Sequence, residues 1–249
     1  MSGDLVSLKM VAIAAVPADL DLWRQAAGRS AVPVDFFAHK ASTGAAMLAE
    51  GGADICLIDN ELPAPEKAAV IAAARSRKPG PLIFVSGPPG SVRPDGIDGM
   101  LATPGNPAEA GRLIEICVRT KIPTKMLIVD DSGTMRSIVR KILSGSRFAL
   151  DMHEAAEGFA ALEQLRTGQF GLVFLDYNMP GLNGLETLSE IRRESPGVAV
   201  VMMTSTLDNA IADRAHTAGA LAFLKKPFYP ADIDNVLERY FGLRAAATR

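Results

Sequence analysis

The chain has 249 residues, of which 48% are hydrophobic and 22% charged, and its formal net charge is −2. This composition is typical of a globular protein, and the length suggests two small domains rather than one. The charge balance excludes a basic module for nucleic acid or an acidic membrane surface, because such a module needs a surplus of lysine and arginine.

The N-terminus, MSGDLVSLKM, lacks the basic and then apolar pattern of a secretory leader. No apolar run approaches the roughly 18 residues that a membrane span requires. The two cysteines, Cys56 and Cys117, provide neither a disulfide framework nor the spacing of a zinc site. We therefore expect a cytoplasmic protein that contacts neither membrane nor nucleic acid.

An internal repeat organises the chain. KMVAIAA at 9–15 matches KMLIVDD at 125–131, and CLIDNELP at 56–63 matches VFLDYNMP at 173–180. The same alignment pairs His39 with His153, Ser86 with Thr204 and Pro107 with Pro230. A repeat of this length predicts two domains of one fold, covering 1–121 and 125–249, with a short linker around 122–124.

The first copy carries one defect. Between its fourth and fifth strand-like runs it reads SGPPGSVRPDGIDGM at 86–100, and the prolines and glycines there cannot support a helix. The fourth helix should therefore be missing from this copy. The sheet face that this helix would cover is then closed either by a partner surface or by the glycine- and proline-rich loop itself.

The second copy alternates short apolar runs with helical patterns. The runs are too short for helices and rich in branched residues, and they occupy 126–130, 148–152, 172–176, 198–203 and 221–224. Ser132 should cap the first helix and Gly145 should end it. Gly168 and Gly219 should close the second and fourth helices, and Gly184 should precede the third. Five such strand–helix units with apolar strands predict a parallel sheet covered on both faces.

Polar side chains follow these strands where each one ends. They are Asp130, Asp131, Asp176, Thr204 and Lys226. Because ligands of parallel α/β sheets bind beyond the carboxyl ends of the strands, we expect these groups to meet at one edge. Packed carboxylates repel one another unless a cation compensates them, and oxygen ligands with room for water suit Mg²⁺.

The segments DDSGTMR, FLDYNMPGLNG, MMTS and LKKPF, in this order and spacing, resemble the response-regulator receiver family of two-component signalling. The closest resemblance is to its stand-alone, chemotaxis-type members. The resemblance implies an α/β fold of two flavodoxin-like (βα)5 receiver domains in tandem. Each would contain a five-stranded parallel sheet of order 2-1-3-4-5, and the first would lack helix 4.

The resemblance also assigns roles to residues. Asp176 would accept a phosphoryl group from a histidine kinase or phosphotransfer protein, and Lys226 would pair with that group, next to a cis Lys226–Pro227 bond. Thr204 and Phe223 would form the switch pair. The ligands of Mg²⁺ would be Asp131, Asp176 and the backbone carbonyl of Asn178, with Asp130 reaching the ion through water.

The first copy does not carry this set. Ala14 and Ala15 replace the aspartate pair, Thr103 replaces the lysine, and Met100 replaces the switch aromatic. Ser86 could still take the place of the switch threonine. Asp59 alone survives, and without Mg²⁺ its phosphorylation would lose the main stabilisation of charge. This copy therefore resembles a degenerate, or pseudo-, receiver.

We expect a response regulator without a DNA-binding output domain, which signals through phosphorylation-dependent binding to another protein. Only FGLRAAATR follows Tyr240. We expect no enzyme activity beyond self-phosphotransfer and slow autodephosphorylation. Two alternatives remain: the regulatory part of a longer enzyme such as a diguanylate cyclase, or an adaptor that ignores phosphorylation. The output partner is unknown, and a homodimer is one option.

Overall fold

The computed structural model describes residues 7–205 and 209–243. The start of the N-terminal stretch and the end of the segment after Tyr240, both considered above, lie outside these residues. The chain divides into two compact units, of which one is Met1–Lys121 with Phe241–Arg249 and the other is Ile122–Tyr240. In the described part of the chain, no helix is both long and apolar enough to cross a membrane.

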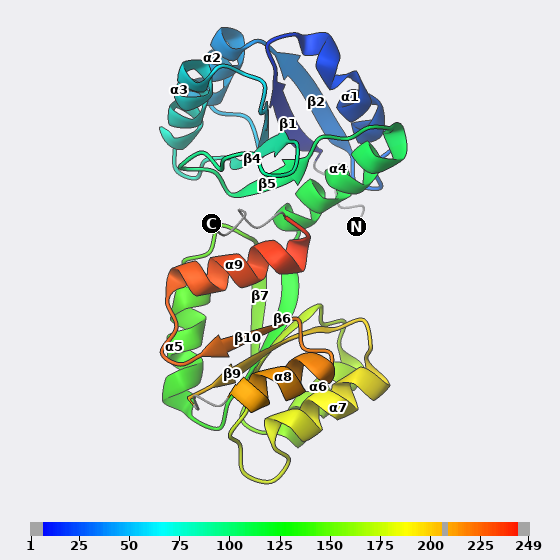
Figure 1. The fold of residues 1–249 in the computed structure, drawn as a ribbon, viewed down its shortest axis with the longest axis vertical. Helices are drawn as coiled ribbons and strands as arrows, with labels where there is room; N and C mark the ends of the chain where they lie inside the picture. The colour runs from blue at the N-terminus through cyan, green and yellow to red at the C-terminus, as the bar shows by residue number, and fades with distance from the viewer. Residues whose placement is uncertain (1–6, 206–208, 244–249) are drawn as a thin grey trace, which may run out of the picture. The chain divides into compact units, whose positions relative to one another are not determined.

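The first unit is built around a parallel sheet of order β2-β1-β3-β4-β5 (Figure 1). Its elements are β1 (Leu8–Ile13), η1 (Pro17–Leu20), α1 (Asp21–Ala27), β2 (Val34–His39), α2 (Ala41–Glu50), β3 (Ile55–Asp59), α3 (Ala64–Arg75), β4 (Leu82–Gly87), β5 (Gly99–Ala102) and α4 (Pro107–Lys121). Helices α1 and α4 lie on one side of this sheet, and α2 and α3 lie on the other.

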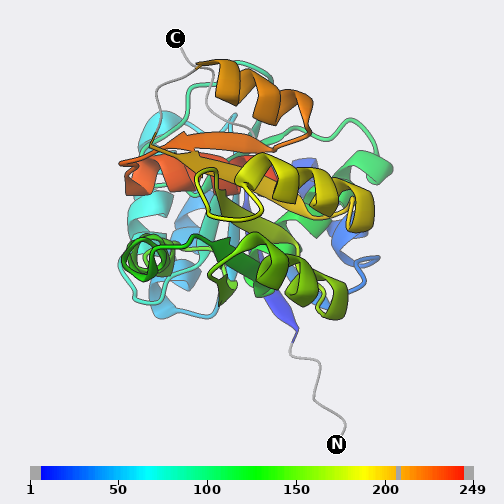
Figure 2. The same ribbon diagram turned by 90° about the horizontal axis from the view of Figure 1, so that it is seen from below.

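The second unit has a parallel sheet of order β10-β9-β8-β6-β7, which is the same arrangement. Its elements are β6 (Thr124–Val129), α5 (Gly133–Ser144), β7 (Leu150–Ala155), α6 (Gly158–Thr167), β8 (Leu172–Asp176), α7 (Gly184–Glu194), β9 (Ala199–Thr204), α8 (Asn209–Thr217), β10 (Ala222–Lys225) and α9 (Pro230–Phe241). Figure 2 shows α6, α7 and α8 following one another, from green to orange, along one face of the sheet.

These two sheets confirm the predicted fold. In each unit the first strand lies between the second and third, so the strand order reverses beside it, as in a flavodoxin-like fold. The central strands are buried on both faces, which explains why β8 reads as an unbroken apolar run until Asp176. The helices are needed because each parallel crossover must pack back onto the sheet.

The second strand of the second unit is the exception to the apolar pattern. The prediction placed it at 148–152, but the ladder with β6 runs from Thr124–Leu150 to Val129–Ala155. The predicted bounds are wrong because β7 is an edge strand, which pairs on one side only and need not be apolar throughout. This shift brings the half-buried Glu154 into the strand.

The predicted loss of a helix from the first unit is confirmed, since residues 88–98 between β4 and β5 form neither helix nor strand. The loop itself closes the sheet face. Ile97 is 3% exposed and joins the apolar core of this unit. From α3, Arg75 donates to the carbonyl of Gly96 at 2.9 Å and to Oδ2 of Asp98 at 2.6 Å. The loop therefore covers the core at Ile97.

We expect Asp98→Ala to destabilise the first unit by about 1–3 kcal/mol, because it removes the counter-charge of the partly buried Arg75 and leaves a buried backbone donor without its acceptor. The carboxylate of Asp98 also accepts the backbone N–H of Ile83 at 2.7 Å. Denaturant unfolding followed by the fluorescence of Trp23 measures this, since Trp23 is the single tryptophan and is buried in the first unit.

Asp21→Ala is the matched control, because Asp21 also pairs with an arginine on its own unit but does so at the surface. Its loss should cost less than about 1 kcal/mol. Equal stability of the two variants would contradict the role given to the Asp98 contacts.

Candidate functional site

A cluster of three acidic side chains lies at the carboxyl edge of the second sheet. Asp130 and Asp131 directly follow β6, and Asp176 ends the neighbouring strand β8. Each offers a carboxylate oxygen within 4.8 Å of those of the other two. Asp130 and Asp176 are buried and Asp131 is exposed. The predicted gathering of these carboxylates is therefore present.

Lys226, which directly follows β10, contacts two of these carboxylates. Its Nζ donates to Oδ2 of Asp130 at 2.6 Å and to Oδ1 of Asp176 at 2.7 Å. The backbone N–H of Lys226 donates to the carbonyl of Thr204 at 2.7 Å, which ties the residue after β10 to the end of β9. The Lys226–Pro227 bond is cis, as the resemblance implied.

The electrostatics of the cluster favour a further cation. The pKa of Asp176 lies above its ordinary value, with burial as the largest cause, although the hydrogen bond and charge of Lys226 lower it. The charges of Asp130 and Asp131 raise that pKa further. Burial lowers the pKa of Lys226, but its bonds to Asp130 and Asp176 outweigh this and leave that pKa above its ordinary value. One ammonium thus faces three carboxylates, an all-oxygen set that fits Mg²⁺.

The cap of α5 also holds the side chain of Asp130. The side chain of Ser132 accepts the N–H of Met135 at 3.3 Å, which confirms it as the cap of α5. The N–H of Ser132 in turn donates to Oδ1 of Asp130 at 2.9 Å. The turn from β6 into α5 therefore holds one oxygen of Asp130 while Lys226 holds the other.

The start of α7 packs directly against the end of β8. Gly184 is the first residue of this helix rather than preceding it, and Asn183 is its cap. A Cβ on Gly184 would lie 2.3 Å from the carbonyl oxygen of Asp176 and 2.7 Å from Cα of Tyr177. These distances are too short for any side chain at this position. Asn178, whose carbonyl was expected to bind metal, is exposed in the loop between these elements.

The expected switch residues lie on neighbouring strands. Thr204 is fully buried at the end of β9 and pairs with Lys225 of β10. Phe223 precedes Lys225 by two residues, so it lies on the same face of the sheet as Thr204. Phe223 pairs with Met202 and packs, partly buried, against the core of this unit. The two are therefore diagonal neighbours across one ladder.

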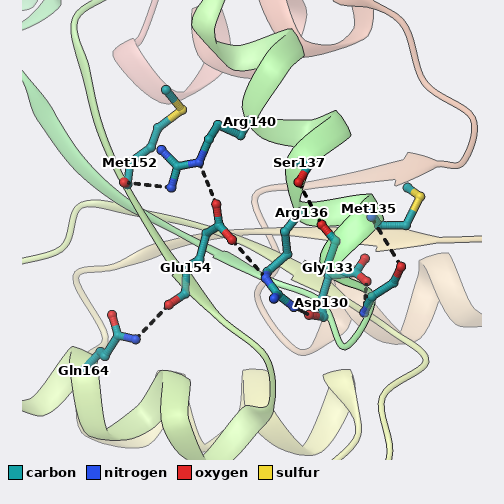
Figure 3. Close-up of polar contacts among 10 residues, drawn as sticks. Asp130, Gly133, Met135, Arg136, Ser137, Arg140, Met152, Glu154 and Gln164 are labelled. Carbon is teal, nitrogen blue, oxygen red and sulfur yellow. Dashed lines mark hydrogen bonds and ion pairs between the residues drawn. The ribbon is translucent and has the colours of Figure 1, made fainter.

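The sequence interpretation missed a group of charged residues behind the cluster (Figure 3). From α5, Arg136 donates through Nη1 to the carbonyl of Asp130 at 2.7 Å and through Nε to Glu154 at 3.0 Å. Arg140 donates to the other oxygen of Glu154 at 2.6 Å. One signal was available, because Arg136 and Arg140 are spaced i, i+4 and so share a helix face.

Strand register corrects two residue pairs of the repeat alignment. Asp59 pairs with Ser86 whereas Asp176 pairs with Met203, so Gly87, and not Ser86, stands where the second unit has Thr204. The alignment was one residue off because it matched hydroxyl to hydroxyl. Likewise, His39 pairs with Ile13, and the equivalent pair in the second unit is Ala155 with Val129. His39 therefore corresponds to Ala155 and not to His153.

The corresponding edge of the first unit has different chemistry. A Cβ on Gly87 would lie 2.7 Å from Cβ of Asn60 and 2.9 Å from Oγ of Ser91, so the loop after β4 occupies that space. Lys67 of α3 donates to the carbonyl of Asn60 at 2.8 Å. Asp59 accepts the N–H of Glu61 at 3.0 Å. Among the residues that the structure describes, this edge has no acidic cluster suited to a metal ion.

Residues 126–238 match the family model described as response regulator receiver domain. Over 119 residues the chain is 37% identical to chemotaxis protein CheY-3 of Vibrio cholerae serotype O1, covering 47% of this chain and 91% of the relative. The chain belongs to the response-regulator receiver family. Chemotaxis protein CheY of Pseudomonas aeruginosa is 33% identical over 119 residues, covering 47% of this chain and 95% of that one.

Solved structures match both units of this response regulator together. One is described as a probable two-component system response regulator/GGDEF domain protein; it is 18% identical, has a TM-score of 0.55, and covers 95% of this chain and 98% of its own. At that identity the likeness concerns the fold, and it agrees with two receiver-like sheets in one chain.

We expect Gly184→Ala to destabilise the receiver unit by about 1–3 kcal/mol, because α7 must move away from the Asp176 carbonyl to make room. Thermal unfolding followed by circular dichroism measures the loss. Gly197→Ala is the control, since a Cβ there meets nothing within 4 Å. A Gly184→Ala protein as stable as this control would refute the steric requirement.

We also expect Glu154 to stabilise the receiver unit to an extent that depends on pH. The hydrogen bond from Arg140, followed by that from Arg136, holds the pKa of Glu154 below its ordinary 4.5, although burial opposes this shift. Because the folded-state pKa is depressed, the stabilisation is complete above about pH 4.5 and is lost as the pH falls through the folded value.

Glu154→Gln should therefore melt below wild type at neutral pH, and the gap should close as the pH falls below about 4.5. Melting temperatures across this range test it, with the exposed Glu163→Gln as control. A gap that stays constant in acid would contradict the charge-based origin.

Proposed function

We propose that the C-terminal receiver, spanning 125–249, accepts a phosphoryl group on Asp176 from a histidine kinase or a histidine phosphotransfer protein. The observation that carries this proposal is the cluster at the carboxyl edge of the second sheet, where Asp130 and Asp176 share Lys226 and Asp131 offers a third carboxylate beside them. Asp131, Asp176 and the carbonyl of Asn178 would hold Mg²⁺ directly, and Asp130 would hold it through water. The ion supplies neutralisation of phosphoryl charge.

In the transfer step, a carboxylate oxygen of Asp176 forms a bond to phosphorus as the P–N bond of a phosphohistidine breaks. The electron pair of that bond returns to the imidazole nitrogen, and the product is an aspartyl phosphate. Little covalent assistance is needed, because such transfer depends on positioning and on charge stabilisation. Lys226, already within hydrogen-bond distance of Asp176, donates to a phosphoryl oxygen.

Phosphorylation adds about two negative charges and three acceptor oxygens beside the end of β9. The hydroxyl of Thr204 then turns toward the new group, and the Phe223 ring moves into the space that it leaves. The two residues lie on one face of adjacent strands, which supports this coupling. The changed surface around α8, β10 and α9 signals by binding an output protein.

The first domain, spanning 1–121, is proposed to be a pseudo-receiver that is not phosphorylated. Its edge has Ala14 and Ala15 in place of the aspartate pair, and Thr103 in place of the lysine. Gly87 supplies no switch hydroxyl, and the loop after β4 fills the space around it. A domain of this kind acts through its surface and not through chemistry.

The relatives that match the receiver are named chemotaxis proteins, which supports an output through protein binding. The alternative is the regulatory part of a longer output enzyme. The two-unit fold is shared with a structure described as a response regulator/GGDEF domain protein, and a GGDEF segment in the full-length reading frame would favour that alternative. A chain whose binding ignores phosphorylation would instead be an adaptor.

The test is to incubate the protein with Mg²⁺ and a small phosphodonor, such as acetyl phosphate, and to measure phosphoryl incorporation by intact mass. We expect wild type and Asp59→Ala to be modified alike, and Asp176→Ala to remain unmodified. Chelation of Mg²⁺ should abolish the modification, because the transition state loses its charge compensation.

Modification that survives in Asp176→Ala but disappears in Asp59→Ala would reverse the assignment of the two domains. The output is tested by pull-down with and without beryllium fluoride, which mimics the phosphoryl group. Partners that bind only in its presence indicate a switch, and partners that bind equally in both states would replace the switch with an adaptor.

A further inference from the structure

Arg136 holds the backbone carbonyl of Asp130, which is part of the peptide group shared with Asp131. The carbonyl oxygen accepts Nη1 of Arg136 at 2.7 Å. The six atoms of a peptide group are coplanar, so fixing the oxygen fixes the plane and the direction in which the chain leaves toward Asp131.

Asp131 needs this external support. In the part of the chain that the structure describes, its exposed carboxylate has no hydrogen-bond partner, whereas Asp130 and Asp176 are both held by Lys226. The direction of the Asp131 side chain therefore depends on its backbone. Arg136 is the side chain that donates to that peptide group.

Arg136 is itself positioned from the sheet. Its Nε donates to Oε2 of Glu154 at 3.0 Å, and Glu154 lies in β7 opposite Ile128 of β6 (Figure 3). The backbone carbonyl of Glu154 accepts the amide of Gln164 at 2.9 Å, which ties α6 to the same strand. The guanidinium is planar and its donors form a rigid fork, so Nε and Nη1 of Arg136 bind Glu154 and the Asp130 carbonyl in one fixed orientation.

We propose that Arg136 is a positioning residue for the metal site of the receiver: through the Asp130 carbonyl it directs the carboxylate of Asp131 toward Asp176. This inference rests on the proposed function, because it concerns the same Mg²⁺ site. Side chains that orient metal ligands from behind typically change metal affinity by about 10- to 100-fold when they are removed.

Arg140 provides the matched control. It donates to the same carboxylate of Glu154, at 2.6 Å, but its second contact is the carbonyl of Met152 at 3.1 Å, away from the acidic cluster. Arg136→Met and Arg140→Met each remove one ion pair with Glu154 and keep an apolar stem. A purely structural role of the Glu154 pairs predicts the same effect for both variants.

The experiment titrates MgCl₂ into the full chain without a phosphodonor and follows the amide resonances of the receiver by NMR. We expect the dissociation constant for Mg²⁺ to rise about 10-fold or more in Arg136→Met and to stay within about twofold of wild type in Arg140→Met. With acetyl phosphate, the Mg²⁺ concentration for half-maximal phosphorylation should rise in parallel, while the rate at saturating Mg²⁺ changes by less than about threefold.

Equal Mg²⁺ affinities in the two methionine variants would overturn the positioning role. If Arg136→Met does not fold, Arg136→Lys is compared with Arg140→Lys, and equal affinities there would overturn it as well. A wild-type chain that binds no Mg²⁺ and takes up no phosphoryl group would defeat the proposed function itself, and that outcome is distinct from a failure of Arg136 alone.

Discussion

The contact of one ammonium with two buried carboxylates is the interaction on which the site depends. Asp130 and Asp176 come from neighbouring strands, and Lys226 holds both at hydrogen-bond distance. Parallel strands make this arrangement available, because their carboxyl ends all meet at one edge. The charges do not balance, since Asp131 adds a third carboxylate and burial raises the pKa of Asp176. That imbalance is the physical reason for a divalent cation in the proposed mechanism.

The two units show that this fold does not require this chemistry. Both contain a parallel sheet of the same order, yet only the second has an acidic cluster among the described residues. In the first, Gly87 stands at the position of Thr204, and the loop that replaces a helix packs against it. Arg75 and Asp98 anchor that loop, and its Ile97 joins the core where the helix is missing. Function therefore follows from the side chains at the edge of the sheet and not from the fold.

Residues that lie behind the acidic cluster also shape the site. Gly184 allows α7 to start against the Asp176 carbonyl, where a larger residue would collide. Arg136 reaches the carbonyl of Asp130 from α5, and Glu154 holds that arginine from the edge strand. Gly184 and Arg136 each lie against the backbone carbonyl of an aspartate and not against its carboxylate. Preorganisation of this kind keeps like charges close together before any cation binds.

The sequence by itself determined the tandem fold, the missing helix, the cap at Ser132 and the gathering of the aspartates with Lys226. These features follow from local rules, since strand periodicity, caps and the carboxyl ends of parallel strands are read along the chain. The register of the strands was decided only by the tertiary structure, which made Gly87 the counterpart of Thr204 in the second copy and placed Glu154 within an edge strand. Register depends on pairing between distant segments, and a slip of one residue leaves the apolar pattern almost unchanged where both faces are buried. The hydrogen bond from Arg136 to a backbone oxygen could not be predicted from the sequence either. Every residue carries such an acceptor, and only packing selects the one that is used.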